Sequence, residues 1–520
     1  MHEADSFVPL TWADMLHLAP ELSLSALFII IVLLDLLLPK RMNRIWIGGW
    51  LTLGSLLLSL GLVIWQLLDR NSGGDAAAET IELLANSYRI DDFSSLLKLV
   101  FLAGAALIVL LAIGSTKDDD AITDRAEYFY LLLPAVVGAM AMASSGNLIS
   151  LYIGLELLSI TSYILVAMRK KSSKSAEAAF KYLITGGISS AFILFGMSYL
   201  YGVTGSVDLG QIGAAIPEAI EDFKALLYVG FFFILAGFGL KIATAPFHAW
   251  APDVYQGAPT PVAAFLAVVS KGAALAAVFR IMYNTAYFAT TGLDAYITKD
   301  VFFALLVLAA AGMLVGTTAA LRQKQVKRLL ALSGVANAGY LLVPIGLSIT
   351  IVHSSNFSEF IYYLIAYLFM TIGAFSVLTA VSRTPGEGEM KDFAGMYYRA
   401  PWTAAAMVVL LLSLAGLPIS GGFFGKLFIL IGAANAKAYW LVAIMVVSSV
   451  ISYYFYFGFI RQMFMRSSSE EDEIKVPATT GIVIWLCVAA TLALGLFPGV
   501  VMEGIDAVIS LQVDLLIPLE

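Results

Sequence analysis

Apolar runs, each about as long as a lipid bilayer is thick, follow one another along this sequence. About 20 apolar residues span the hydrocarbon core as one α-helix, and runs of about that length recur between residues 20 and 503. Lipid offers the backbone no hydrogen-bond partner, so such runs must form helices. Because 60% of the residues are hydrophobic and 13% are charged, the sequence predicts an all-α polytopic membrane protein rather than several soluble domains.

We predict about fourteen transmembrane helices from these runs. They cover residues 20–39, 45–68, 94–114, 127–145, 148–168, 178–201, 225–249, 260–284, 301–321, 328–351, 358–382, 402–433, 438–462 and 479–503. Lys and Arg are enriched in the cytoplasmic loops of membrane proteins, and most of the 30 basic residues fall in loops that follow odd-numbered helices. This distribution predicts cytoplasmic basic loops and both termini outside.

Two of the predicted helices are interrupted. Pro246 lies within the seventh, and Pro418 with the pair Gly421-Gly422 lies within the twelfth. Proline removes an amide donor and clashes with the preceding turn, which a membrane helix tolerates only beside protein or a water-filled cavity. Interrupted helices five apart indicate a repeated transporter unit with sites at the breaks. We therefore predict two inverted five-helix repeats, helices 4–8 and 9–13. The segments are 1–126 (three N-terminal helices), 127–284 and 285–466 (the repeats), and 467–520 (the last helix).

Apart from Lys98, at the outer end of the third helix, four lysines lie within predicted transmembrane helices: Lys181, Lys241, Lys271 and Lys426. An ionised side chain at the bilayer centre costs at least about 2.5–3.5 kcal/mol on insertion scales, so such residues usually face the bundle interior and serve a function. A desolvated lysine can release its proton near neutral pH, whereas arginine stays protonated. The lysines therefore predict a row of proton-binding sites that needs no cofactor.

Glu156 is the only acid between Glu127 and Glu177, and it shares one helix face with Tyr152, Ser159 and Tyr163. A carboxylate close to a lysine favours the protonated lysine and releases the proton when the pairing changes. We predict this role for Glu156. A structural ion pair is the alternative.

The spacing of Lys241, Thr244 and His248 predicts one shared helix face that opens on a common cavity. The alternative is a kinked helix whose lysine reaches the membrane interface. For Lys181 the same alternative applies, at the cytoplasmic surface. Arg280 lies near the end of its helix, and we predict that it anchors the helix at the outer interface.

The sequence offers few metal ligands. Cys487 is the only cysteine, so neither an internal disulfide nor a cysteine-bound cluster is expected. The four histidines form no metal-binding motif; they are His2, His17, His248 and His353. The net charge of −7 is too modest to suggest nucleic acid as a partner.

Four stretches resemble one protein family. The run from Lys241 to Val262, with Pro-Phe-His-Ala-Trp-Ala-Pro-Asp-Val-Tyr-Gln-Gly-Ala-Pro-Thr-Pro-Val, is similar to the subunit N family of the proton-pumping NADH:quinone oxidoreductases, respiratory complex I. The Gly-Leu-Glu156 element, Lys327–Ser333 with the later Gly339-Tyr340, and Gly416–Lys426 also look like that family. The related subunit M type typically has glutamate where Lys426 stands, which favours subunit N.

The resemblance implies roles for single residues. Glu156 would be the modulating acid, Lys241 its loading partner, Lys271 the connector and Lys426 the exit-side site, while Lys181 and His248 would be further relays. In many relatives a histidine lies two residues before the Gly-Tyr pair of helix 10. Here that residue is Asn337, which cannot titrate, so a proton passing there needs water or another side chain.

The resemblance also implies a function and a setting. The chain would move protons through the Glu/Lys row, driven by redox chemistry in other subunits that hold FMN, iron–sulfur clusters and quinone, with no cofactor of its own. Subunits M and K would be its neighbours, in the lipid bilayer of a bacterial plasma membrane. The alternatives are a subunit of a multi-subunit cation/proton antiporter, or of a ferredoxin- or hydrogenase-linked proton-pumping complex. A non-transporting scaffold would not need membrane lysines.

Overall fold

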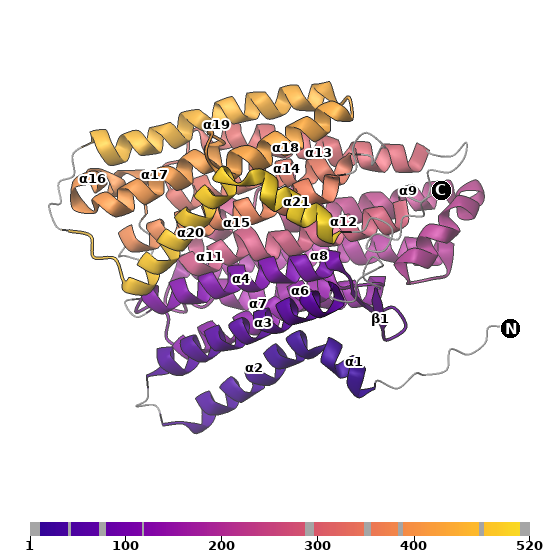
Figure 1. Ribbon diagram of the computed structural model, residues 1–520, viewed down its shortest axis with the longest axis horizontal. Coiled ribbons are helices and arrows are strands. Elements are labelled where there is room, and N and C mark those ends of the chain that lie inside the picture. Colours follow the sequence, from indigo (N-terminus) through magenta and orange to yellow (C-terminus); the bar gives the residue numbers. More distant parts are fainter. Residues whose placement is uncertain are drawn as a thin grey trace.

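The computed structural model describes residues 11–39, 43–71, 80–116, 119–286, 296–347, 355–382, 388–466 and 473–509. In these ranges the chain is almost entirely helical, with long helices packed side by side in one bundle (Figure 1). One small antiparallel hairpin, β1 (Ile81–Leu83) and β2 (Tyr88–Ile90), is the only sheet in the described part of the chain. The prediction of an all-α membrane fold is confirmed.

The N-terminal part forms one edge of the bundle, where α2 lies farthest from the centre (Figure 1). Asp91 begins the last helix of this part with a capping box, in which its side chain and that of Ser94 each accept from the other's backbone N–H. The helices are α1 (Trp12–His17), α2 (Ala19–Leu37), the π-helix η1 (Trp46–Trp50), α3 (Leu51–Asn71) and α4 (Asp92–Ser115).

The middle of the chain contains the seventh predicted helix, which corresponds to α9. With 34 residues, α9 is about 50 Å long and exceeds the roughly 30 Å hydrocarbon core. It is kinked at Phe223, close to the boundary predicted at residue 225. The helices are α5 (Arg125–Tyr130), α6 (Leu132–Ala143), α7 (Leu148–Val166), α8 (Ser173–Thr204), α9 (Leu209–Ile242), α10 (Ala251–Gly257), α11 (Thr260–Phe265), η2 (Leu266–Ser270), α12 (Lys271–Ile281) and η3 (Met282–Ala286).

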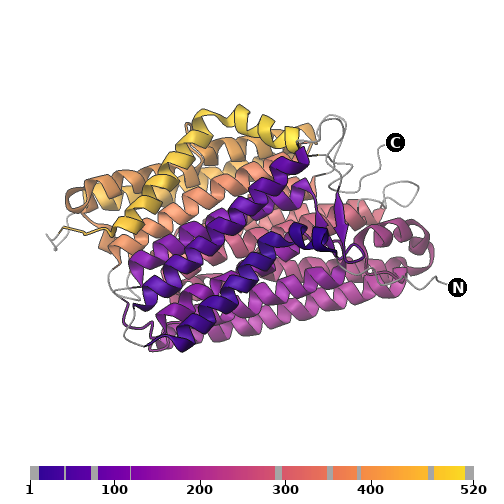
Figure 2. The ribbon, with the colours of Figure 1, turned by 60° about the horizontal axis from the view of Figure 1, so that its bottom comes forward.

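The C-terminal part covers the bundle from the other edge, where α19 lies (Figure 1). Figure 2 shows the same bundle turned by 60°, with the purple N-terminal helices crossing in front. The helices are α13 (Tyr296–Ala320), α14 (Val326–Gly346), α15 (Asn356–Val381), the 3-10 helix η5 (Met390–Phe393), α16 (Met396–Arg399), α17 (Pro401–Ala415), α18 (Gly421–Asn435), α19 (Tyr439–Met465), α20 (Ala478–Leu496) and α21 (Pro498–Val508).

Thirteen helices in the described residues are long and apolar enough to cross a membrane. The twelfth predicted helix is divided into two shorter apolar helices, α17 and α18. Both predicted breaks are therefore confirmed, and the thirteen long helices with this pair are consistent with the predicted count of about fourteen. The inverted relation of the repeats and the four segment boundaries stay predictions.

The centre of the bundle is formed by α14 and by the helix of residues 260–285. In α14 every residue of the most apolar 18-residue stretch is buried. The buried share of the corresponding stretch is 94% in residues 260–285 and 22% in α2. The first and last described helices, α1 and α21, lie at the same end of the bundle (Figure 1).

The prediction that Arg280 anchors its helix at the outer interface is wrong, because the side chain is fully buried. Its guanidinium donates to both carboxylate oxygens of Asp91, at 2.6 and 3.0 Å, and to the carbonyl of Ala143 at 2.6 Å. It also lies 4.6 Å from the ring centre of Phe93. The counter-charge comes from a residue 189 positions earlier, which hydropathy along one helix cannot reveal.

Candidate functional site

The first break lies immediately after Lys241. Helix α9 ends one residue later, and Ala243 adopts the left-handed conformation with φ 59°, as residues after helix ends often do. The backbone N–H of Ala243 and the indole N–H of Trp250 both donate to the carbonyl of Leu240, at 3.2 and 2.9 Å. A carbonyl that the break would leave free therefore has partners, and the break is a capped helix end.

The predicted shared face of Lys241, Thr244 and His248 is wrong. The helix ends before Thr244, so helical spacing does not apply beyond that point. Thr244 Oγ1 donates instead to the carbonyl of Leu308 in α13, at 3.0 Å. His248 lies half-buried in the segment between α9 and α10.

The Lys241 ammonium is bound by hydroxyls of α7. It donates to Ser159 Oγ at 2.6 Å and to the hydroxyl of Tyr163 at 3.3 Å, and it lies 5.7 Å from the centre of the Tyr163 ring. Both residues belong to the predicted polar face of Glu156. Glu156 lies one turn earlier, half-buried, with its Oε1 atom buried and without a hydrogen-bond partner. No ion pair joins it to Lys241 in the described structure, where Ser159 of the same helix accepts from the ammonium.

Aromatic rings cover this site, and the sequence analysis did not identify two of them. The ring of Tyr182 stacks on Trp250, with centres 4.9 Å apart, and meets the ring of Tyr163 edge-on at 4.8 Å. Trp250 also caps α9, as described above. The signal available in the sequence was a tryptophan four residues after Pro246.

Lys181 lies away from the bundle centre, with 40% of its side chain exposed. Its ammonium contacts Glu177 at 2.7 Å and Asp253 at 2.6 Å, and the other oxygen of Asp253 pairs with Arg328. Burial raises the pKa of Asp253, but the hydrogen bonds from Lys181 and Arg328 outweigh it and hold that pKa below its usual value. This surface cluster, Lys181–Asp253–Arg328, joins α8, α10 and α14, and its geometry favours the surface alternative for Lys181.

Lys271 lies in the centre of the bundle, with 4% of its surface exposed. It begins α12 directly after the π-helix η2, and short π-helical segments are frequent at functional sites. Its ammonium donates to the carbonyl of Gly334 in α14, at 2.7 Å. Among the described residues it has no carboxylate partner.

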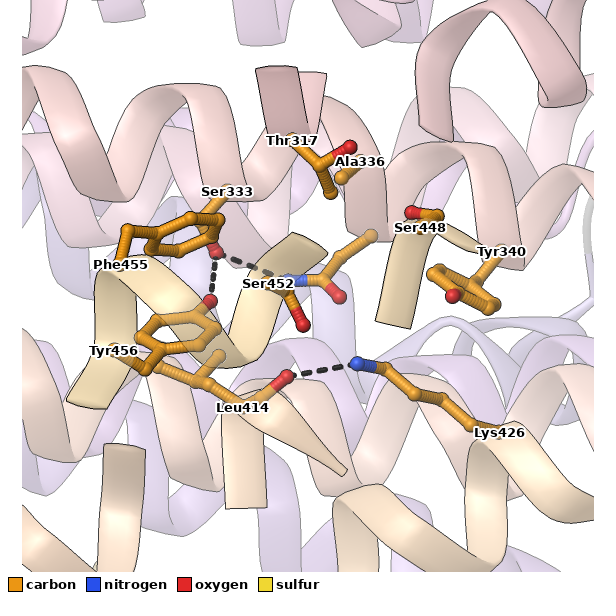
Figure 3. A pocket seen from close by; sticks show the side chains of 11 residues that line it. Thr317, Ser333, Ala336, Tyr340, Leu414, Lys426, Ser448, Ser452, Phe455 and Tyr456 are labelled. Carbon is orange, nitrogen blue, oxygen red and sulfur yellow. Dashed lines mark hydrogen bonds between the residues drawn. The ribbon is translucent and has the colours of Figure 1, made fainter. Parts of the chain in front are cut away.

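Lys426 is bound by the end of its own broken helix. Its ammonium donates to the last two carbonyls of α17, Leu414 at 2.8 Å and Ala415 at 3.2 Å, as Figure 3 shows for Leu414. The negative end of the α17 dipole favours a cation there. The ring centre of Tyr340 lies 5.0 Å away. Gly416 ends α17 with φ 86°, and a Cβ at that position would lie 3.0 Å from Lys426 Cδ.

A small polar cavity of about 10 Å³ lies beside Lys426 (Figure 3). The hydroxyls of Ser333 and Tyr456 are hydrogen-bonded there. Asn337 Nδ2 donates to Ser333 Oγ at 3.3 Å, and the hydroxyl of Tyr363 donates to Asn337 Oδ1 at 2.8 Å. The lining residues are Thr317, Ser333, Ala336, Asn337, Tyr340, Leu414, Lys426, Ser448, Ser452, Phe455 and Tyr456.

The structure thus brings the predicted residues together only in part. Lys241 and Glu156 lie on adjacent helices at the first break, and Lys426 lies at the second. Lys271 lies in the central helix between residues 260 and 285, whereas Lys181 lies at the surface. No group of three or more His, Cys, Asp or Glu side chains that could hold a metal ion occurs among the described residues; His2 and His353 lie outside them.

Comparisons with known proteins show which family the chain belongs to. Residues 145–452 match the family described as NADH:quinone oxidoreductase/Mrp antiporter, TM. A protein of Paenibacillus sp. (strain JDR-2) named NADH-quinone oxidoreductase subunit N is 66% identical over 518 residues, which cover 98% of this chain and 99% of that protein.

Solved structures show the same architecture. A chain of respiratory complex I from Thermus thermophilus with bound aureothin is similar with a TM-score of 0.76 and 30% identity, over 93% of this chain and 98% of that chain. A chain of the Mrp complex from Dietzia sp. DQ12-45-1b reaches a TM-score of 0.78 at 19% identity, over 95% of this chain and 97% of that chain. That second likeness concerns the fold alone. The sequence match decides the family, and this chain belongs to the subunit N family of the NADH-quinone oxidoreductases, the antiporter-like proton-translocating membrane subunits of complex I.

Proposed function

We propose that Glu156, Lys241, Lys271 and Lys426 carry protons through this subunit. The observation that supports this most directly is the surroundings of the three lysines: each ammonium is bound only by hydroxyl or carbonyl oxygens among the described residues. A cation enclosed without a counter-charge costs free energy. Release of the proton removes that cost, so each lysine can alternate between two protonation states.

The four residues have different tasks in this proposal. Glu156 favours the protonated form of Lys241 across Ser159, and a change in their separation releases the proton. Lys271 receives it at the centre of the bundle, where α14 encloses it. Lys426 then holds it at the end of α17 before release. Lys181 and His248 assist at the entrance, where Lys181 lies in the surface cluster with Asp253.

We infer further that electron transfer takes place in other subunits. The donor set of this chain supports that inference, because the single cysteine, Cys487, cannot bind an iron–sulfur cluster alone. FMN, iron–sulfur clusters and quinone would be bound by partner subunits, and the chain would act as the translocating part of a translocase without redox chemistry of its own. Subunits M and K are the neighbours we propose.

The proposed setting is a bacterial plasma membrane with both termini outside. The concentration of Lys and Arg in the loops after odd-numbered helices supports this orientation. The placement of α1 and α21 at one end of the bundle is consistent with it (Figure 1).

A multi-subunit cation/proton antiporter is the competing function, and the Mrp-like fold is the observation in its favour. A ferredoxin- or hydrogenase-linked pump is a further alternative. Purification of the chain from its native membrane distinguishes them. We expect it to copurify with subunits that bind flavin and iron–sulfur clusters and that oxidise NADH. Cation/proton exchange in vesicles that lack those subunits would contradict the proposal.

Substitution tests the proposed residues directly. Lys241→Ala and Glu156→Ala should leave the complex assembled and lower NADH-driven proton uptake into vesicles, since each variant removes a group that binds or biases the proton. Ser376→Ala provides a control, because Ser376 is buried and donates only within its own helix, to Ile372 at 2.7 Å. Normal pumping and turnover in both variants would refute the assigned roles.

A further inference from the structure

The cavity beside Lys426 is lined by a residue of α14 that is adjacent in sequence to the residue that binds Lys271. The carbonyl that accepts the Lys271 ammonium belongs to Gly334, and the residue before it, Ser333, lines the cavity. Lys426 lines the other side (Figure 3). The Lys426 ammonium thus borders this polar space, whereas the Lys271 ammonium lies beyond its wall, on the carbonyl of Gly334. The four residues of the proposed function leave the other groups of the cavity without a role.

Hydrogen bonds connect the cavity residues Asn337, Ser333 and Tyr456 in a chain that continues to Tyr363, outside the cavity lining. Tyr363 donates to Asn337 Oδ1 at 2.8 Å, Asn337 Nδ2 donates to Ser333 Oγ at 3.3 Å, and Ser333 shares a hydrogen bond with the hydroxyl of Tyr456 in which either oxygen can be the donor. The amide of Asn337 is thus held at both ends. It fixes Ser333 but cannot itself pass a proton on.

The other polar groups of the wall can accept hydrogen bonds from water. Thr317 and Ser448 both donate to the carbonyl of Met313, at 2.7 and 3.3 Å, and Ser452 donates to the carbonyl of Ser449 at 2.7 Å. Each of these hydroxyls donates its hydrogen to a backbone carbonyl. The lone pairs of its oxygen remain able to accept a hydrogen bond from water. A buried water needs two to four polar partners and about 10–15 Å³ for its centre. The cavity wall provides the partners, and the cavity of about 10 Å³ has room for about one water molecule.

We propose that this cavity binds water and that the Ser333–Tyr456 hydroxyl pair is the proton relay between Lys271 and Lys426, with Asn337 as the residue that positions it. This inference rests on the proposed function, since it supplies the step between two residues of that row. It also explains how a proton passes α14 where the chain has an asparagine rather than a titratable side chain.

The transfer balances without a further reactant. A proton arriving from the Lys271 side binds one hydroxyl oxygen as the proton already on that oxygen leaves along the shared hydrogen bond. The second oxygen releases its own proton to water on the Lys426 side. Both hydroxyls then rotate back, and the pair returns to its first state with one proton moved.

The test compares Tyr456→Phe and Ser333→Ala with matched controls in the purified complex, reconstituted in phospholipid vesicles. Tyr362→Phe and Ser376→Ala remove buried hydroxyls outside the cavity, which bond Leu494 and Ile372. We expect each cavity variant to lower NADH-driven proton uptake about tenfold, less than the 10²–10⁴ of a positioned acid–base group because water bypasses part of the path. The controls should pump like the unaltered complex.

Two measurements separate a relay from packing. Ser333→Thr keeps the hydroxyl and should keep most of the pumping, whereas a loss as large as that of Ser333→Ala would overturn the proposal. The slowing of proton uptake in heavy water should be greater in Tyr456→Phe than in the controls, and an unchanged ratio would also overturn it. Normal pumping in Tyr456→Phe and Ser333→Ala beside an inactive Lys426→Ala would refute the relay and leave the proposed function standing. Normal pumping in Lys426→Ala and Lys241→Ala would refute the proposed function itself.

Discussion

The two broken helices each place a lysine at a break, but they bind it in opposite ways. At the first break Lys241 lies before the interruption, and side-chain hydroxyls of another helix, α7, accept from it. At the second break Lys426 lies after the interruption, and backbone carbonyls of α17 accept from it. The first lysine can therefore change partners by small motions of α7 against α9. The second is tied to the shape of the break itself.

Removal of the lysine should affect stability most at the second break. Lys426→Ala leaves the carbonyls of Leu414 and Ala415 without these hydrogen bonds, and a buried unsatisfied acceptor costs about 1–3 kcal/mol. Lys241→Ala leaves hydroxyls that keep other bonds, such as that of Ser159 to the carbonyl of Leu155. We expect the purified complex to melt at a lower temperature with Lys426→Ala than with Lys241→Ala. Equal melting temperatures would remove the distinction between the two breaks.

Substitution of the left-handed residue that follows each helix should have the next largest effect on thermal stability. Gly416→Ala places a side chain at φ 86°, against the Lys426 stem, and left-handed backbone costs a non-glycine residue about 1–2 kcal/mol. Ala243→Gly is the reverse change at φ 59° and relieves that cost. Differential scanning calorimetry of the complex should show a lower transition for Gly416→Ala. A lower transition for Ala243→Gly as well would contradict this explanation.

Loss of a single hydroxyl should have a smaller effect at each break. Tyr163→Phe removes one hydrogen bond to Lys241, worth about 0.5–1.5 kcal/mol. Tyr340→Phe keeps the ring that lies over Lys426, because that tyrosine's hydroxyl bonds Met445 and Ser449 instead. Proton uptake by vesicles should fall several-fold, as that energy range implies, in Tyr163→Phe and change less in Tyr340→Phe. The opposite order would show that hydroxyl contacts do not distinguish the breaks.

The smallest effect concerns Asp253, on the short helix α10 after the first break. Its pKa is lowered in the folded protein by Lys181 and Arg328, so its stabilising contribution is present above its unfolded pKa of about 3.9 and is lost as pH falls through the lower folded value. Asp253→Asn should lower the melting temperature slightly at pH 7, and the difference from the unaltered complex should vanish only in strong acid. A difference that disappears between pH 6 and 8 would contradict this assignment.

The sequence predicted the parts of the site that depend on local chemistry. Proline and glycine inside apolar runs located both breaks, and long uncharged surroundings identified Lys271 and Lys426 as buried. The end of α9 was missed because Ala243, in left-handed conformation, carries no sequence signal of its own. The predicted shared face that included His248 failed for the same reason.

Contacts between distant segments could not be predicted from the sequence. Arg280 and Asp91 form a fully buried pair, yet each looks like the polar end of a helix when read alone. Tyr363 and Tyr456 lie in apolar runs and resemble core residues, although their hydroxyls belong to a polar chain. Such roles depend on which helices become neighbours.

The burial of α14 has a consequence for the synthesis of the protein. One side of α14, with Ser333 and Asn337, is covered by α18 and α19, which are made about a hundred residues later. Until those helices enter the membrane, the polar residues of that side have no cavity to line. We therefore expect the interior of the transport path to close last during biogenesis, after most of the chain has already been inserted.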